Sequence, residues 1–298
     1  MIFGKKMSQG SEPRLKIKRK IRHTPIQIVV CVLFAIYSAI ILFPFVYAIL
    51  ISLETTFEFE NTAFPMPKVL QFKNYVTAWK SLKSDAGSGV PEMFLNSLWY
   101  AGGGTIIGLA CGIMTAYAVA RYKFPGRQFV YYFVLITMMI PVIGSMPSNL
   151  KMMVALKAYN SPLYVVIASV GTGAGFLVFY ATFKGIDWGY AEAAFIDGAG
   201  HFTVFFRIML PQIIAPALAI GLSEFIAAWS NAEVPLVYFP RLPTLASGLL
   251  EYEKVAKKDQ TYPVYFAGLI TCMIPTVALF TVFQKYFLDI QIGGGLKG

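Results

Sequence analysis

The sequence predicts an all-α, polytopic membrane protein with six transmembrane helices. Of its 298 residues, 57% are hydrophobic and only 13% are charged, whereas a soluble domain carries charge on about a quarter of its residues. Nearly uncharged runs also recur that are long enough to cross about 30 Å of hydrocarbon, which takes roughly 20 helical residues. These runs are continuously apolar, without the period-two alternation of a membrane β-barrel, so a barrel is excluded.

The apolar runs define the expected organisation of the chain. The first run follows a basic segment, as in a signal peptide, but it is far longer than the apolar part of a cleavable signal, about 7 to 15 residues. We therefore expect an uncleaved anchor. The predicted spans are 26–53, 93–120, 128–150, 161–183, 211–239 and 262–287. Around them we expect a basic leader at 1–25, a transmembrane domain at 26–288 and a tail at 289–298.

The basic residues indicate the orientation. The formal net charge is +10, from 25 Lys and Arg against 15 Asp and Glu, but the basic residues are scattered among apolar runs, which argues against nucleic-acid binding. With the N-terminus inside, fifteen of them lie on the cytoplasmic side and ten outside, as the positive-inside rule requires. Both termini are then cytoplasmic. The segments expected outside are 54–92, 151–160 and 240–261, and the segment 184–210 is expected inside.

Several classes of chemistry are absent from the sequence. The three cysteines show no C-x-x-C spacing and there are only two histidines, so neither a disulfide framework nor a metal site is expected. Neither G-x-S-x-G nor H-E-x-x-H occurs, which argues against a membrane-embedded hydrolase. The phosphate-binding pattern G-x-x-x-x-G-K-[ST] is also missing. We therefore expect no enzyme and no bound cofactor, and any ATP chemistry must come from a partner.

Small residues mark two spans. In the second span they stand four apart, which places them on one helix face and predicts close helix packing, in preference to a surface along which substrate slides. In the fourth span, three glycines near the middle indicate either a close approach or a local irregularity. The first set is Gly104, Gly108, Gly112, Ala116 and Ala120; the second is Gly171, Gly173 and Gly175.

The segment 184–210 reads as a helix, a turn and a helix. Residues 190–196 are good helix formers, and Gly198 follows where a left-handed residue would end the helix. A second, amphipathic helix is expected to lead into the fifth span, because apolar side chains then recur at helical spacing. They are Phe202, Phe205, Phe206 and Met209. A short, rigid helix that protrudes from the membrane fits a groove on a partner protein.

The same segment carries an ordered motif. The pattern E-A-A, three residues, Gly, nine residues and I-x-L-P is filled by Glu192, Ala193, Ala194, Gly198, Ile208, Leu210 and Pro211, with Asp197 and Ala199 beside the glycine. On these residues the chain resembles the permease subunits of binding-protein-dependent ABC importers, in the carbohydrate-type, MalG-like group. The stretch AYAVARYKFPGR at 116–127 is similar to that group as well.

The resemblance implies a fold, partners and a location. The fold would be a type I ABC importer transmembrane domain, also called MetI-like, with a cytoplasmic coupling helix. The partners would be a second, MalF-like permease subunit, two ATPases that bind ATP and Mg, and an extracytoplasmic solute-binding protein. The location would be the cytoplasmic (inner) membrane of a bacterium or archaeon. The residues that would contact the ATPase are Tyr190, Glu192, Ala193, Ala194, Asp197, Gly198 and Ala199.

The expected function is import of a carbohydrate, and more narrowly of an oligosaccharide. The fifth span supports this group through Trp229, Pro235 and Leu236, but it departs from the group at Ser230, where Asn is usual, and at Glu233, where an apolar residue is usual. Two alternatives are an ABC permease for a non-sugar solute, such as a peptide, polyamine or phosphate, and a secondary transporter. A secondary transporter does not explain the ordered motif.

The fifth span also supplies candidate substrate residues. A carboxylate in mid-bilayer costs roughly 2.5 to 3.5 kcal/mol on insertion scales, so it should face protein or water. An aromatic ring with nearby polar groups can hold a hydroxyl-rich sugar. The alternative is hydrogen bonding between helices, or to the partner subunit. The candidates are Glu224, Trp229, Asn231 and Glu233, of which Glu233 could instead reach water or the binding protein.

Overall fold

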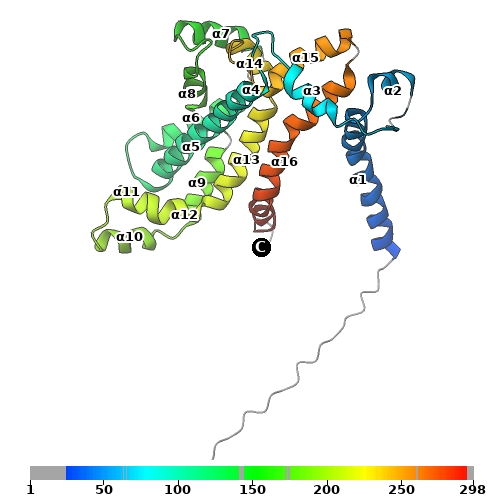
Figure 1. Ribbon diagram of the computed structural model, residues 1–298. Helices are drawn as coiled ribbons and strands as arrows, with labels where there is room; N and C mark the ends of the chain where they lie inside the picture. Colours follow the sequence, from blue (N-terminus) through cyan, green and yellow to red (C-terminus); the bar gives the residue numbers. More distant parts are fainter. Residues whose placement is uncertain are drawn as a thin grey trace, which may run out of the picture. The chain divides into compact units, whose positions relative to one another are not determined.

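A computed structural model describes residues 25–62, 64, 66–140, 144–171, 173, 175–259 and 261–293 (Figure 1). Within these residues all regular elements are helices, and the β-type pairing is a single isolated bridge between Lys83 and Gly89. The prediction of an all-α protein is therefore confirmed. The predicted tail at 289–298 is described only to residue 293, and nearly all of the leader lies outside the described residues.

Sixteen α-helices and two π-helical segments make up the described chain. In order they are α1 (Pro25–Ser52), α2 (Thr56–Asn61), α3 (Lys73–Ser81), α4 (Val90–Ser97), η1 (Leu98–Gly103), α5 (Gly104–Arg121), α6 (Arg127–Met139), α7 (Met146–Ala155), α8 (Leu163–Ser169), α9 (Gly175–Gly185), α10 (Gly189–Ile196), α11 (His201–Val204), η2 (Phe205–Met209), α12 (Leu210–Gln212), α13 (Ile214–Ser230), α14 (Glu233–Tyr238), α15 (Leu245–Asp259) and α16 (Tyr262–Gly293).

Three helical stretches among the described residues are long and apolar enough to cross a membrane. They are Pro25–Ser52, Val90–Arg121 and Tyr262–Val282, which agree with the first, second and sixth predicted spans. The chain divides into two compact units, residues 1–46 and 47–298. In the first unit the side chains of α1 from Ile26 to Val46 are exposed and mostly apolar, as suits a helix surrounded by lipid.

The third and fourth predicted spans are not continuous helices, which corrects the expectation from hydropathy. Over 128–150, α6 ends at Met139 and α7 begins at Met146. Ile140, which precedes Pro141, has extended backbone (φ −78°, ψ 113°), the conformation that a residue before proline prefers. Over 161–183, α8 ends at Ser169 and α9 begins at Gly175, after the glycine-rich stretch. The glycines therefore mark a local irregularity.

A bend lies at the start of the fifth predicted span. Helices His201–Gln212 and Ile214–Ser230 meet at 74°, and together they are apolar enough for one broken span. Pro216 has no N–H to donate to the carbonyl of Gln212, and its ring crowds that carbonyl, which accounts for the bend near Ile213. The span also stops early, because α14 is separated from α13 by Asn231 and Ala232.

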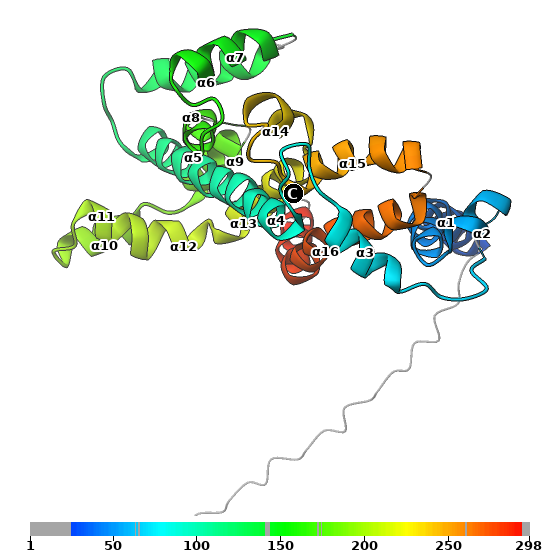
Figure 2. The same ribbon diagram turned by 45° about the horizontal axis from the view of Figure 1, so that its top comes forward.

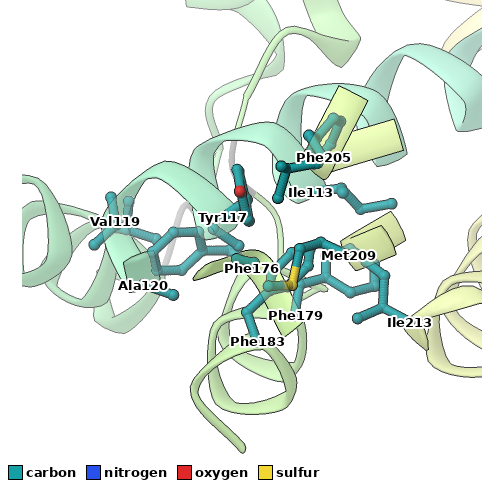
Figure 3. Packing of buried hydrophobic residues seen from close by; sticks show 14 residues of the cluster. Ile113, Tyr117, Val119, Ala120, Phe176, Phe179, Phe183, Phe205, Met209 and Ile213 are labelled. Carbon is teal, nitrogen blue, oxygen red and sulfur yellow. The ribbon is translucent and has the colours of Figure 1, made fainter. Parts of the chain in front are cut away.

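The largest buried cluster joins α5 and α9 to the segment 201–213 (Figure 3). Helices α5 and α9 lie side by side in both ribbon views (Figures 1 and 2). Tyr117 of α5 is at the centre, with its ring centroid 4.8 Å from that of Phe205, 5.2 Å from that of Phe183 and 5.6 Å from that of Tyr122. This aromatic core connects a predicted membrane helix to the segment that carries the ordered motif.

Gly248 permits a close approach of α15 to α4. A Cβ atom at Gly248 would overlap Sδ of Met93, and Met93 is fully buried. Overpacking of this kind costs about 1 to 3 kcal/mol. We therefore expect Gly248→Ala to lower the thermal unfolding temperature of the purified protein. Gly185→Ala, where nothing lies within 4 Å of the added carbon, is the control, and equal unfolding temperatures for the two variants would contradict this packing.

Candidate coupling loop and substrate cavity

Helix α10 begins and ends as the sequence predicts. The backbone N–H of Gly189 donates to Oδ1 of Asp187 at 2.9 Å, which starts the helix. At its other end Gly198 is left-handed, with φ +83°. The N–H of Gly198 donates to the carbonyl of Phe195 at 3.0 Å, and that of Ala199 donates to the carbonyl of Ala194 at 2.9 Å. These two bonds form a Schellman motif, which needs a left-handed residue at the position of Gly198.

One face of α10 is buried and the other is exposed to solvent. Ala191 is fully buried, and Ala194 and Phe195 pack partly against the aromatic core. Tyr190 and Ile196 are 61% and 86% exposed, and exposed apolar side chains on a protruding helix are typical of an interaction surface. Four other predicted contact residues are also exposed: Glu192, Ala193, Asp197 and Gly198.

Ile196 was not among the residues predicted to contact a partner. Its signal in the sequence is the helical period, because it follows Tyr190 and Ala193 in steps of three. The expected second helix is also present, but its four apolar side chains divide between two faces. Phe205 and Met209 are buried, whereas Phe202 and Phe206 are exposed.

Arg121 ties the end of α5 to the start of the loop. Its Nη2 donates to the backbone carbonyls of Phe183 and Ile186, at the C-terminal end of α9. Its guanidinium carbon also lies 5.3 Å from the ring centroid of Trp188, the residue before α10. None of these contacts of Arg121 was predicted from the sequence. The feature of the sequence that points to Arg121 is its position as the charged residue that directly follows an uncharged span.

The small-residue face of α5 divides into two parts. At its C-terminal half the face packs as expected: Gly112 lies against the ring of Phe179 from α9, and Ala116 and Ala120 are buried in the aromatic core. At its N-terminal half, Gly104 and Gly108 line a cavity instead. The packing prediction is therefore confirmed for the C-terminal half of this face.

The cavity has a volume of about 480 Å³ and lies between α5, α8 and α13. Its carboxylate is that of Glu224, which is half-buried. The two oxygens of Glu224 would lie 3.7 Å and 3.8 Å from Cβ atoms built on Gly108 and Gly173, which is ordinary van der Waals contact, so the carboxylate lies beside both glycines. The hydroxyl of Thr105 is buried and has no hydrogen-bond partner among the described residues. The carboxylate of Glu224 therefore lies at the cavity, whereas the hydroxyl of Thr105 is buried.

Glu224 lines this cavity, and the three other predicted substrate residues lie elsewhere. Trp229 is buried, and its indole N–H donates to the carbonyl of Cys272 on α16 at 3.2 Å. The Oδ1 atom of Asn231 accepts from the N–H of Val234 at 2.9 Å, in the first turn of α14. Glu233 is exposed. Trp229 therefore holds α13 against α16, and Asn231 helps to start α14.

The chain is similar to permease proteins of transport systems over most of its length. A permease protein of a diacetylchitobiose uptake system from Streptomyces coelicolor is 28% identical over 257 residues, which is 85% of this chain and 83% of that protein. The permease protein MalG of a trehalose/maltose transport system from Thermococcus litoralis is 29% identical over 270 residues, or 89% and 95% of the two chains.

The fold also matches a solved structure. A chain of a bacterial ABC transporter involved in import of the acidic polysaccharide alginate superposes with a TM-score of 0.74, at 21% identity, over 88% of this chain and 96% of that one. Residues 104–289, more than half of the chain, match the family described as the inner membrane component of binding-protein-dependent transport systems. The chain belongs to this family of membrane transport components.

Proposed function

We propose that this chain is one of two membrane subunits of an ABC importer that moves a carbohydrate, more narrowly an oligosaccharide, into the cytoplasm. The observation that carries the proposal is α10, an exposed helix whose motif residues end in a left-handed glycine. The family membership supports a transport role. The carbohydrate is supported by the relatives, whose names specify diacetylchitobiose and trehalose or maltose.

We propose six membrane crossings with both termini in the cytoplasm. The arrangement of the loops supports this topology, because segments predicted on the same side meet. The backbone N–H of Asp85 donates to the carboxylate of Glu251 at 2.9 Å, and that of Arg241 donates to Oδ1 of Asn160 at 3.0 Å. These bonds link the three segments predicted outside, which are 54–92, 151–160 and 240–261.

The segments predicted inside meet in the same way. Arg121 donates to the carbonyls of Phe183 and Ile186, and the hydroxyl of Tyr122 lies 3.0 Å from Nδ1 of His201. Within residues 47–298, Figure 1 shows α10 and α11 at the opposite end from α7, α14 and α15. The third crossing would then consist of α6 and α7, the fourth of α8 and α9, and the fifth of α13 and α14.

The contacts of α10 provide a route for coupling. The helix would insert into a cleft of a partner ATPase, which binds ATP and Mg. Because α10 rests on the aromatic core and is joined to α5 through Arg121, a displacement of α10 would move α5 as well. Helix α5 lines the cavity through Gly104 and Gly108, so the displacement would reach the cavity wall. Nucleotide can drive this change only if it binds one global state more tightly than the other.

Substrate would pass through the cavity beside Glu224. A carboxylate accepts hydrogen bonds from sugar hydroxyls, and the rings of Tyr100 and Tyr164 line the same space. Ser169 adds a hydroxyl. Aromatic faces combined with a few polar groups suit a hydroxyl-rich ring. The external binding protein, which the family's description implies, would deliver the substrate, and the second permease subunit would complete the pathway.

Glu224→Gln should weaken transport without preventing assembly. A hydrogen bond to a charged group contributes about 1.5 to 3 kcal/mol, so we expect a rise of about tenfold or more in the substrate concentration for half-maximal uptake. Uptake of labelled maltodextrin or chitobiose by the reconstituted transporter measures this. The control is Glu233→Gln, an exposed acid outside the cavity. Equal uptake by both variants would show that Glu224 does not contact the transported substrate.

The same proteoliposomes test the alternatives. Uptake of a peptide, polyamine or phosphate in place of every sugar tried would favour a permease for another solute. Uptake that proceeds without ATP in the presence of all partner subunits would favour a secondary transporter. The proposal expects sugar uptake that requires ATP, the partner ATPases and the binding protein.

A further inference from the structure

A second polar cavity, distinct from the one beside Glu224, lies between α5, α6 and α9 and has a volume of about 430 Å³. Two cations face it, Arg127 at the start of α6 and Lys184 at the end of α9. The remaining polar lining is an amide and three phenols: Gln128, Tyr131, Tyr132 and Tyr180. This concentration of hydrogen-bond donors has no part in the proposed path of the sugar.

The charged side chains that line this cavity are both positive. No acidic residue lines it, and among the described residues no carboxylate forms an ion pair with Arg127 or Lys184. The ammonium group of Lys184 lies 5.4 Å from the ring centroid of Tyr180, which holds it at the cavity. Two uncompensated cations beside phenol and amide donors suit an anion with several oxygen atoms, such as a phosphate group.

The cavity opens beside an uncovered apolar surface. Phe129, Phe133 and Ile136 of α6 follow each other at helical spacing, and each is more than half exposed. Helix α6 has 13 residues, so it is about 20 Å long, and one leaflet of hydrocarbon is about 15 Å thick. Tyr131, Tyr132 and Tyr180 also fit a position at the membrane surface, because tyrosine is enriched where hydrocarbon meets water.

We propose that this cavity binds the headgroup of an anionic phospholipid. The phosphate would lie between Arg127 and Lys184, and an acyl chain would lie along Phe129, Phe133 and Ile136. The apolar stripe favours a lipid over free phosphate, because a soluble anion gains nothing from contact with apolar side chains. Basic pockets between transmembrane helices are a recurrent form of lipid headgroup site. The proposal requires only that this end of α6 lies at a membrane surface, and it holds for either leaflet.

Lipid titrations of the complete purified transporter test the proposal by native mass spectrometry. Binding of phosphatidylglycerol is compared with binding of phosphatidylcholine. Each cation near a membrane surface strengthens anionic-lipid binding about fivefold, so Arg127→Gln or Lys184→Gln should each weaken phosphatidylglycerol binding about fivefold. The double variant should weaken it about 25-fold. Phosphatidylcholine binding should not change. The matched control is Arg207→Gln, an exposed cation that does not line the cavity.

Further variants keep the result interpretable. Arg127→Lys with Lys184→Arg keeps both charges and should retain most of the binding, which separates loss of charge from misfolding. Phe133→Gln should weaken lipid binding while both cations remain. Wild-type affinity of the double glutamine variant, or equal affinity of wild-type protein for the two lipids, would overturn the proposal. Full displacement of lipid by millimolar inorganic phosphate, with no effect of Phe133→Gln, would show a site for a soluble anion and would also overturn it.

Discussion

Replacing Gly198 by valine should abolish most of the ligand-stimulated ATP hydrolysis and uptake of the assembled transporter. Gly198 has φ +83°, and a β-branched residue in left-handed backbone is strained by roughly 1 to 2 kcal/mol. The strain falls on the Schellman motif that ends α10. Its release would reposition Ile196 and Asp197, which lie at the exposed end of the helix. We expect uptake to fall about tenfold or more, because strain of this size shifts a conformational equilibrium by about that factor.

Gly200 provides a matched control two residues away. Its φ is −76°, which any residue can adopt, and nothing lies within 4 Å of a Cβ built there or at Gly198. Gly200→Val should therefore leave uptake close to that of the unaltered transporter. Reconstituted transporter with full ligand-stimulated ATPase activity in the Gly198→Val form would refute the coupling assignment. Equal losses in both variants would show that bulk in the loop, and not backbone conformation, is what matters.

Arg121→Met should separate ATP hydrolysis from transport. The variant loses the hydrogen bonds to the carbonyls of Phe183 and Ile186 and the contact with Trp188. Hydrogen bonds from a charged donor contribute about 1.5 to 3 kcal/mol each, and the cation–π contact adds about 0.5 to 1 kcal/mol. The end of α9 would then fray, and movement of α10 would reach α5 only through the aromatic core. We expect basal ATPase activity to remain while substrate-stimulated uptake falls.

Two comparisons make the Arg121 result specific. Arg121→Lys keeps the charge but not the planar fork that reaches two carbonyls, so it should restore only part of the uptake. Arg207→Met removes an exposed cation from the same predicted side and should have little effect. Hydrogen exchange over residues 183–189 should rise in Arg121→Met. Unchanged exchange together with unchanged uptake would show that Arg121 is not the connection between α5 and α10.

The helix and turn at 189–199 could be predicted because their sequence signals are local. Good helix formers followed by Gly198 predicted a helix with a left-handed end, and the structure has α10 with that end. The motif required no information about distant residues. The buried side of the same helix was not predicted, since Ala191 is buried by Phe and Tyr side chains from other helices.

Helix continuity and the cavity depend on distant contacts, which hydropathy does not contain. A continuous apolar run predicted one helix over 128–150, but hydropathy does not detect the extended backbone of Ile140 or the left-handed backbone of Gly144. The run of residues from Glu224 to Glu233 suggested one polar group, but the end of α13 at Ser230 separates Asn231 and Glu233 from Glu224. Trp229 could be assigned to helix packing only once Cys272 of α16 was seen beside it.

Site-specific cross-linking would show whether α10 lies in the cleft of a partner ATPase. Ile196→Cys would be introduced after replacement of the three native cysteines, Cys31, Cys111 and Cys272, and paired with cysteines placed around the cleft of the ATPase. Lys254→Cys on α15, which is predicted outside, is the control. The account predicts a disulfide from Ile196→Cys that forms in the assembled transporter and changes in yield with nucleotide, and none from Lys254→Cys. Labelling of Ile196→Cys from outside intact cells, or no cross-link in any nucleotide state, would contradict it.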